Sequence, residues 1–283
     1  MKLPDFDYHS PTSLDEAIAL MATPNARVLA GGQSLLPIMA FRLAAPSALV
    51  DLRKVKGLDQ IEIKQDAIHL GPMVRWRDVE RHEGLAAALP MLTQAMEHVA
   101  HYQIRNRGTV GGSLAHADPA AEFPGIAVTC DARIHLAGTS GKRVVAAADL
   151  FVGPLETCLQ DGEIITSIEL PRWPQARRWA FEEFSQRRGD FALAGVALFY
   201  DLDGEQRAQN VHIGVIGATD RPRRLPGAEA ALYGHGISEE VIAKACAAAS
   251  AEVDPPSDIH GSAAYRRSLV GTLLQRALVK ASR

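Results

Sequence analysis

Two glycine-containing segments of this sequence combine residue types and spacings that could do chemistry. Residues 30–34 read Ala-Gly-Gly-Gln-Ser, and residues 109–113 read Thr-Val-Gly-Gly-Ser. Glycine lets a backbone approach a ligand closely and adopts positive φ without strain. Successive free N–H groups form a concave site for phosphate oxygens. Two such segments, each ending in a hydroxyl side chain, indicate a ligand with two phosphates.

Each segment also has a purely structural interpretation. The first could form a tight turn, although the helix expected after Ser34 favours an anion site because a helix N-terminus attracts negative charge. Asp118, in an Ala-Asp-Pro turn, could accept a hydrogen bond from a ribose hydroxyl or could cap the turn. Arg105 and Arg107 could neutralise phosphates or could be solvated surface residues. The segment 187–191 could stack its terminal aromatic on a planar ligand or could be a charged loop.

Other signatures are absent from the sequence. There is no G-x-G-x-x-G or Walker loop, no G-x-S-x-G or H-E-x-x-H, and the ten histidines show no zinc-ligand spacing. The cysteines Cys130, Cys158 and Cys246 form no C-x-x-C pair, which argues against an iron–sulfur cluster held by this chain alone. We expect three buried thiols in a reducing compartment and no metal site.

The composition is that of a globular protein, with 47% apolar and 22% charged residues. A net charge of −3, from 30 basic and 33 acidic residues, argues against a nucleic-acid or anionic-membrane partner. The N-terminus lacks a signal-peptide pattern, and the apolar run 191–200 is too short to span a bilayer. We therefore expect a cytoplasmic protein without a transmembrane segment.

The elements that position the glycine segments follow from periodicity. Ser13 and Glu16 have capping-box spacing at the start of a helix, and the first glycine pair follows a strand at 26–30. The other predicted elements are helices at 34–43, 76–81, 86–101, 119–129, 238–251 and 265–279, hairpins at 60–73 and 132–146, and strands at 48–52, 164–170, 179–184, 195–200 and 211–216. The order is not the βαβαβ series of a Rossmann domain.

With these motifs established, the chain resembles the FAD-binding medium subunits of the molybdenum hydroxylases. That family includes bacterial carbon monoxide dehydrogenase, nicotine- and quinoline-type dehydrogenases and the flavin domain of xanthine dehydrogenase. The resemblance covers essentially the whole chain, and the matching segments are 30–37, 103–113, 117–122, 161–165 and 188–194.

The resemblance implies an α+β fold of the vanillyl-alcohol-oxidase/p-cresol-methylhydroxylase type, in which two α/β subdomains hold FAD. It divides the chain into an N-terminal subdomain at 1–55, a middle subdomain at 56–173 and a C-terminal domain of antiparallel sheet and helices at 174–283.

The same resemblance maps FAD contacts onto individual residues. Pyrophosphate contacts fall on the backbone of the two glycine segments, and an adenosine or ribitol contact falls on Asp118. Phe191 would shield the isoalloxazine ring. The full implied set is Val28, Leu29, Ala30, Gly31, Gly32, Gln33, Ser34, Leu35, Val99, Thr109, Val110, Gly111, Gly112, Ser113, Asp118, Ile165, Asp190 and Phe191.

The family function implies two partner subunits in electron transfer. A large subunit with a molybdopterin cofactor oxidises the substrate, a small subunit with two 2Fe–2S clusters carries the electrons, and FAD on this chain delivers them to an external acceptor. Such complexes are expected as dimers of heterotrimers. Because the flavin does the chemistry, we expect no catalytic acid, base or nucleophile in the chain.

Two departures from relatives are visible. Gln33 replaces a histidine of the carbon monoxide dehydrogenases, which argues against carbon monoxide as substrate. Glu182 and Glu183 lie where some relatives place a lysine near the flavin. Two other functions stay open: a stand-alone FAD-dependent reductase or oxidase, and a non-redox nucleotide-binding scaffold.

Overall fold

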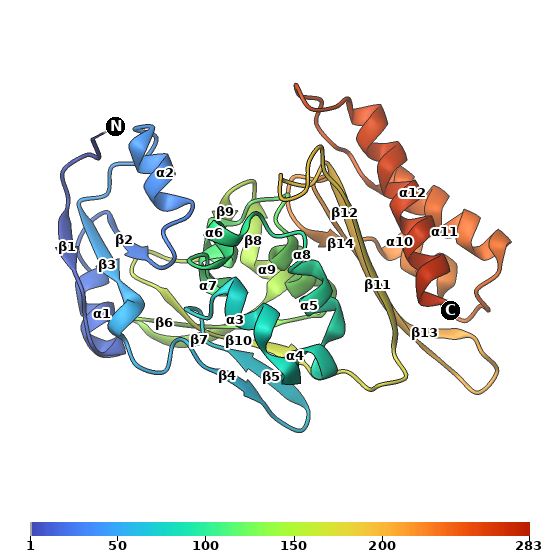
Figure 1. Ribbon diagram of the computed structural model, residues 1–283, viewed down its shortest axis with the longest axis horizontal. Helices are drawn as coiled ribbons and strands as arrows, with labels where there is room; N and C mark the ends of the chain where they lie inside the picture. The colour runs from blue at the N-terminus through green and yellow to red at the C-terminus, as the bar shows by residue number, and fades with distance from the viewer. Residues whose placement is uncertain (1) are drawn as a thin grey trace.

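The computed structural model describes residues 2–283. Figure 1 shows three units side by side along the longest axis: a small unit coloured blue, a middle unit coloured cyan to green, and a sheet with helices coloured yellow to red. Each unit contains a sheet of its own, and the sheets have three, five and four strands. A two-stranded ribbon completes the middle unit.

The N-terminal unit is a parallel sheet in the order β1-β3-β2. The Ser13 hydroxyl accepts a hydrogen bond from the Glu16 N–H at 3.2 Å, as the capping-box spacing predicted. The Glu16 carboxylate accepts from the N–H of Thr12. The elements are β1 (Asp7–His9), α1 (Leu14–Met21), β2 (Ala26–Leu29), α2 (Leu35–Ala40) and β3 (Ala48–Asp51).

The middle unit is an antiparallel sheet in the order β4-β5-β10-β6-β7, packed against short helices. Its strands are β4 (Ile61–Ile63), β5 (Ala67–Leu70), β6 (Arg133–Gly138), β7 (Gly141–Ala146), β8 (Phe151–Gly153), β9 (Glu156–Thr157) and β10 (Ile164–Pro171). Its helices are α3 (Trp76–Arg81), α4 (Glu83–Ala88), α5 (Pro90–Ala95), α6 (Tyr102–Arg105), α7 (Val110–His116), α8 (Glu122–Thr129) and α9 (Ala147–Leu150). The short helix η1 (Leu52–Lys54) precedes this unit and packs with the N-terminal core through Leu52.

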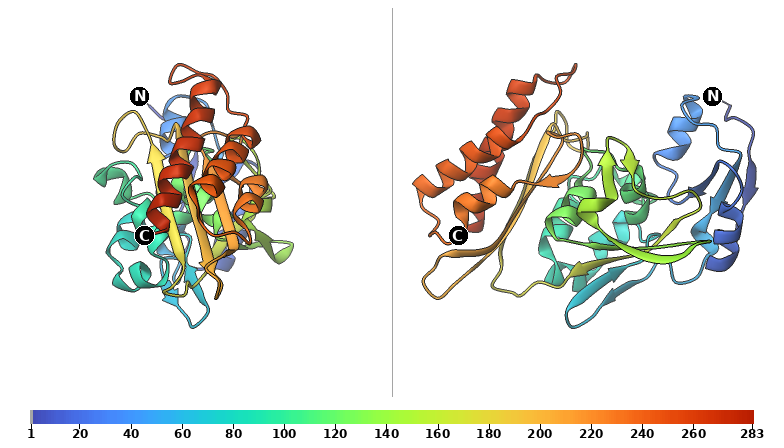
Figure 2. Two further views of the ribbon diagram at one scale, coloured as in Figure 1. Left: turned by 90° about the vertical axis from the view of Figure 1, so that its right-hand side faces the viewer. Right: turned by 180° about the vertical axis from the view of Figure 1, so that it is seen from behind.

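The C-terminal unit is an antiparallel sheet in the order β11-β12-β13-β14. Helix α12 packs on β11 and β12, whereas α8 of the middle unit packs on β12 and β13, so the sheet has helices on both faces (Figure 2). The elements are β11 (Arg178–Phe184), β12 (Ala194–Leu202), β13 (Ala208–Ile216), β14 (Arg223–Arg224), α10 (Pro226–Leu232), α11 (Glu239–Glu252) and α12 (Ala263–Ala281).

The predicted fold class is confirmed, and three predicted helices differ in extent. The helix predicted at 86–101 is wrong as a single element: Pro90 begins α5 because proline suits the first turn of a helix, and Ala100 has φ of 41°. Helix α2 spans only 35–40, and the positive φ of Arg42 follows. Helix α8 begins at Glu122 because Asp118 forms a turn first. None of the helices within residues 2–283 has the length and apolar character to cross a membrane.

Candidate functional site

The structure brings the two glycine segments into direct contact. A Cβ on Gly31 would overlap the carbonyl oxygen of Arg107 and lie 2.9 Å from the Cα of Gly108. A Cβ on Gly112 would lie 3.7 Å from the Cβ of Ala30. The connection between β2 and α2 is therefore packed against the connection between α6 and α7.

The first segment presents a run of unpaired donors. Within the described chain, the backbone N–H groups of residues 31–35 donate to no acceptor of the protein. Gly32 has φ of +71°, a conformation that glycine adopts without strain. The side-chain amide of Gln33 donates to the carbonyl oxygen of Gly31 at 3.2 Å, so Gln33 braces the turn from inside. This arrangement suits a ligand rich in oxygen acceptors.

The second segment is the first turn of α7 rather than an open loop. The N–H of Val110 donates to Val74 O at 3.0 Å and that of Gly111 to Pro72 O at 3.0 Å. The N–H of Gly112 donates to the Thr109 hydroxyl oxygen at 3.2 Å. These N–H groups have acceptors within the chain, which leaves the Ser113 hydroxyl, the O–H donor of Thr109 and the bare Cα of Gly112 for a ligand.

Gly111 is required by packing. A Cβ there would overlap Pro72, so this glycine fixes α7 against the end of β5.

The charged residues near the second segment have structural contacts. Arg105 Nη1 donates to Val99 O at 3.0 Å and to Ala100 O at 3.1 Å, so Arg105 fixes the backbone before α6. The Arg107 side chain is exposed. Asp118 Oδ1 accepts from the N–H of Ala120 at 2.9 Å, which is the turn-capping role considered for it.

The loop that carries Asp190 and Phe191 reaches the middle unit. A Cβ on Gly189 would lie 2.7 Å from Ala100 O and 2.7 Å from the ring of His101. Phe191 is 67% exposed, whereas Val99, in the segment that leads into α6, is 7% exposed. The loop between β11 and β12 therefore lies against the segment that leads into α6.

The remaining predicted residues are apolar and lie in or beside the core. Leu29 is 8% exposed and lies beside Gly32, where an added Cβ would be 3.3 Å from Leu29 Cδ1. Val28 packs against the N-terminal core. Ile165, on β10, is 6% exposed and belongs to the middle core.

Two buried carboxyl groups lie outside the predicted set of site residues, although the resemblance places one of them, Glu183, near the flavin. Glu122 is 8% exposed, and burial raises its pKa to about 7. The Glu183 side chain is 1% exposed; burial, with the Glu122 charge second, raises its pKa to about 9. Strand alternation in the sequence could have indicated that Glu183 is buried, because Glu183 lies on the same face of β11 as Trp179 and Phe181.

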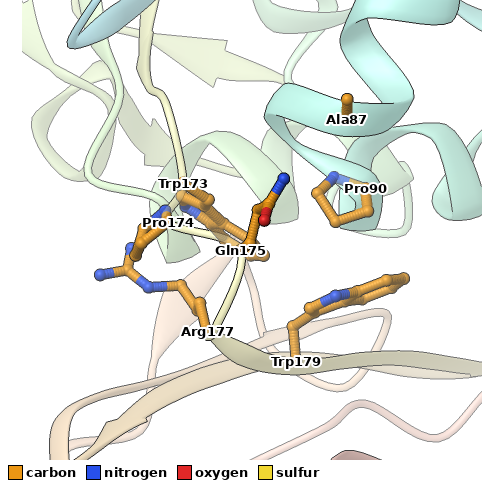
Figure 3. A pocket seen from close by; sticks show the side chains of 7 residues that line it. All are labelled: Ala87, Pro90, Trp173, Pro174, Gln175, Arg177 and Trp179. Atoms are coloured by element: carbon orange, nitrogen blue, oxygen red, sulfur yellow. The ribbon is translucent and has the colours of Figure 1, made fainter.

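A cavity of about 210 Å³ lies away from the glycine segments, beside α5 and the chain that leads into β11 (Figure 3). Its lining contains none of the predicted cofactor-binding residues. Arg177, which lines it, pairs with Asp201 at 2.7 Å and lies over the Phe199 ring at 4.5 Å. No group of His, Cys, Asp and Glu side chains across residues 2–283 is placed to hold a metal ion.

Comparisons with known proteins cover the whole chain. Residues 4–173 match the family described as the FAD binding domain in molybdopterin dehydrogenase. Residues 179–281 match the CO dehydrogenase flavoprotein C-terminal domain.

Among characterised sequences, the nicotine 6-hydroxylase medium subunit of Paenarthrobacter nicotinovorans is 43% identical over 99% of both chains. The carbon monoxide dehydrogenase medium chain of Hydrogenophaga pseudoflava is 33% identical over 97% of this chain and 96% of the relative.

Solved structures agree. Quinoline 2-oxidoreductase from Pseudomonas putida 86 superposes with a TM-score of 0.95 at 40% identity, covering 100% of this chain and 98% of the other. Carbon monoxide dehydrogenase from Hydrogenophaga pseudoflava, in a form that lacks the Mo-pyranopterin moiety of the molybdenum cofactor, superposes with a TM-score of 0.96 at 34% identity. The match covers 100% of this chain and 99% of the other.

Proposed function

Because the chain belongs to the family of FAD-binding medium subunits of molybdenum hydroxylases, we propose that it is the subunit through which electrons leave such a complex. Electrons arrive from two 2Fe–2S clusters of a small partner subunit and pass through FAD to an external acceptor. The observation that supports this role best is the junction of the two glycine segments, where the unpaired N–H groups of residues 31–35 lie beside the start of α7.

The first segment fits a diphosphate. Its consecutive free donors supply hydrogen bonds, and Gly32 supplies the positive φ that the turn requires. We assign the pyrophosphate of FAD to the backbone of residues 30–35. Val28 and Leu29 then form the apolar base on which this turn rests.

The second segment contributes hydroxyl groups and space. Thr109 and Ser113 offer hydroxyls, and Gly112 lets a ligand pass close to the first turn of α7. Asp118 keeps its second carboxylate oxygen available for an adenosine or ribitol hydroxyl. We retain the assignment of residues 109–113 and Asp118 to FAD, with the contacts of Val110 and Gly111 limited to packing because their N–H groups are already paired.

The flavin end lies, in this proposal, between the middle and C-terminal units. Bound FAD supplies the transfer of one or two electrons. Val99 and Ile165 provide apolar contacts, while Asp190 and Phe191 cover the ring and limit the access of water and oxygen. With the proposed domains at 1–55, 56–173 and 174–283, we expect FAD to lie between the first two domains, with the third as a cover.

The partners follow from the same assignment. Relatives are named as medium subunits or medium chains, which supports a complex with a large molybdenum-cofactor subunit and a small iron–sulfur subunit. We propose a dimer of such heterotrimers. The substrate binds the large subunit and is therefore not determined by this chain.

The test is the flavin content and electron transfer of the purified protein. We expect one FAD per chain, released on denaturation and identified by chromatography, and flavin bleaching when substrate reduces the complete complex. Purified chain that holds ADP or no nucleotide would contradict the proposal and would favour a scaffold. Rapid NADH oxidation by the chain alone would favour a stand-alone reductase.

A further inference from the structure

Glu183 occupies an unusual position for a carboxyl group. Along β11, alternate side chains point to opposite faces of the sheet. Glu182 faces α12, where its carboxylate accepts from Lys280 Nζ at 3.0 Å. Glu183 faces the middle unit together with Phe181. Its side chain is 1% exposed, and its Oε2 has no hydrogen-bond partner.

Glu122 approaches the same space from the middle unit. It is the first residue of α8, which packs on β12 and β13. Ile216 is the shared neighbour: a Cβ on Gly125, one turn after Glu122, would overlap Ile216 Cγ2. A Cβ on Gly195, which pairs with Glu183 across the sheet, would lie 2.8 Å from Ile216 Cγ1 and 3.5 Å from Glu183 Cγ. The two glutamates therefore lie on elements that meet at Ile216, on opposite sides of the interface between the units.

The surrounding charges do not neutralise this pair. Among the described residues, neither carboxyl forms an ion pair with a lysine or arginine; the nearest basic group is His98, whose Nδ1 is 3.9 Å from Glu183 Oε1. Burial lowers the pKa of His98, and the charges of Arg188 and Lys280 lower it further, against opposing effects of Glu97 and Glu182. Asp118 adds a negative charge on the Glu122 side. The lowered pKa of His98 disfavours its charged form as a counter-ion to Glu183.

Two buried carboxylates without a counter-ion cannot both be charged at reasonable cost. Burying one unpaired charge is already expensive, and two like charges at one site raise the cost further. A single proton shared by the pair removes one charge and provides the hydrogen-bond donor that the unpartnered oxygen lacks. Such a pair titrates as a unit.

We infer that Glu122 and Glu183 form a carboxyl–carboxylate pair that holds one proton at neutral pH, and that at higher pH, where the oxidised protein has released this proton, reduction of the adjacent flavin makes the pair take it up again. The second half of this inference rests on the proposed function. His98 directly precedes Val99, and the β11–β12 loop that follows Glu183 packs on Ala100. The pair thus lies behind the wall assigned to the flavin.

The proton and electron balance is simple. Two electrons pass from the reduced iron–sulfur donor to FAD, and the added negative charge raises the proton affinity of the pair. Above the pH at which the pair loses its proton in the oxidised protein, the pair takes one proton from water during reduction. When the acceptor reoxidises the flavin, the pair returns that proton to water. Both residues are positioning residues and form no bond to FAD.

Infrared spectroscopy of the purified full-length chain tests the first half without any need for FAD. We expect a protonated-carboxyl C=O band at pH 8 in the wild type, with an unchanged band in Glu182→Gln and loss of the band in Glu183→Gln. In Glu122→Gln the band should disappear at a lower pH than in the wild type, because the repulsion from the Glu122 charge is lost.

An absent wild-type band at pH 8, or a band unaltered in Glu183→Gln, would overturn the shared proton. The wild-type titration alone decides this point if a variant fails to fold.

Redox titration of the FAD-loaded chain tests the second half. The midpoint potential of the flavin should show a break in its pH dependence that Glu183→Gln removes and Glu182→Gln retains. An identical pH dependence in wild type and Glu183→Gln would refute the coupling to the flavin. A chain without bound FAD would refute the proposed function instead, while the infrared result would still stand.

Discussion

Gly31 lies directly against the carbonyl oxygen of Arg107, so that any side chain at position 31 would overlap that oxygen. This contact joins the β2–α2 connection to the α6–α7 connection. The requirement for glycine at position 31 therefore comes from the packing of two loops. The neighbouring free N–H groups, rather than Gly31 itself, are suited to a phosphate.

The loop junction gives the first prediction. Gly31→Ala should separate the two segments, destabilise the protein by about 1–3 kcal/mol through overpacking and lower FAD occupancy. Thermal unfolding and flavin content measure both effects. Gly204→Ala is the matched control, since a Cβ at Gly204 has no neighbour within 4 Å and should change neither quantity. If Gly31→Ala were as stable as the wild type, the two segments would not need glycine at position 31 for their packing.

Charge in the first segment gives the second prediction. Gly32→Asp should abolish FAD binding because the carboxylate would lie beside the donors assigned to the pyrophosphate. Gly57→Asp is a control for backbone strain, since Gly57 has φ of +85° and open space around it, compared with +71° at Gly32. Full flavin occupancy in Gly32→Asp would contradict the phosphate assignment. We expect the same loss in Gly112→Asp, where an added Cβ would also lie 2.8 Å from the Thr109 hydroxyl oxygen.

The exposed aromatic of the β11–β12 loop gives the third prediction. Phe191→Ala should leave FAD bound and change the rate at which the reduced flavin is reoxidised, because the ring loses its cover. Stopped-flow absorbance of the flavin measures this rate. Phe41→Ala, which alters a similarly exposed ring (66% against 67%) in the N-terminal unit, should have no effect. Unchanged kinetics in Phe191→Ala would remove Phe191 from the site.

The carboxyl pair gives a prediction on stability against pH. The pKa of Glu183 is raised from 4.5 to about 9 in the folded chain, so the unfolded state releases this proton at lower pH than the folded state. Stability is therefore lost as pH rises from 4.5 to about 9. Glu183→Gln should lack this loss and exceed the wild type by roughly 2–5 kcal/mol at pH 9. Parallel stability curves for the two proteins in chemical denaturation would contradict the raised pKa.

Local signals in the sequence predicted much of the fold. The capping spacing of Ser13 and Glu16 located α1, and the alternating segments located both hairpins of the middle sheet. The helix predicted at 86–101 failed because apolar periodicity continues across Leu89, while Pro90 begins a new helix. The periodicity of apolar residues along a sequence does not show where one helix ends and another begins in a new direction.

The candidate site was predictable in composition but less so in geometry. The two glycine segments were identified, yet the role of Gly111 depends on Pro72, a tertiary neighbour that sequence proximity does not reveal. Gln33 proved to brace the first turn. Glu183 could be placed in an apolar column of β11, but only the packing of α8 shows that Glu122 shares its environment.

The most direct test of the central claim follows the flavin absorbance of the purified complex after substrate is added under anaerobic conditions. We expect that the iron–sulfur and flavin bands both bleach, and that a complex containing the Gly32→Asp chain loses the flavin change while its iron–sulfur clusters are still reduced. Flavin that stays oxidised beside reduced clusters in the wild-type complex would contradict the role of this chain in electron transfer.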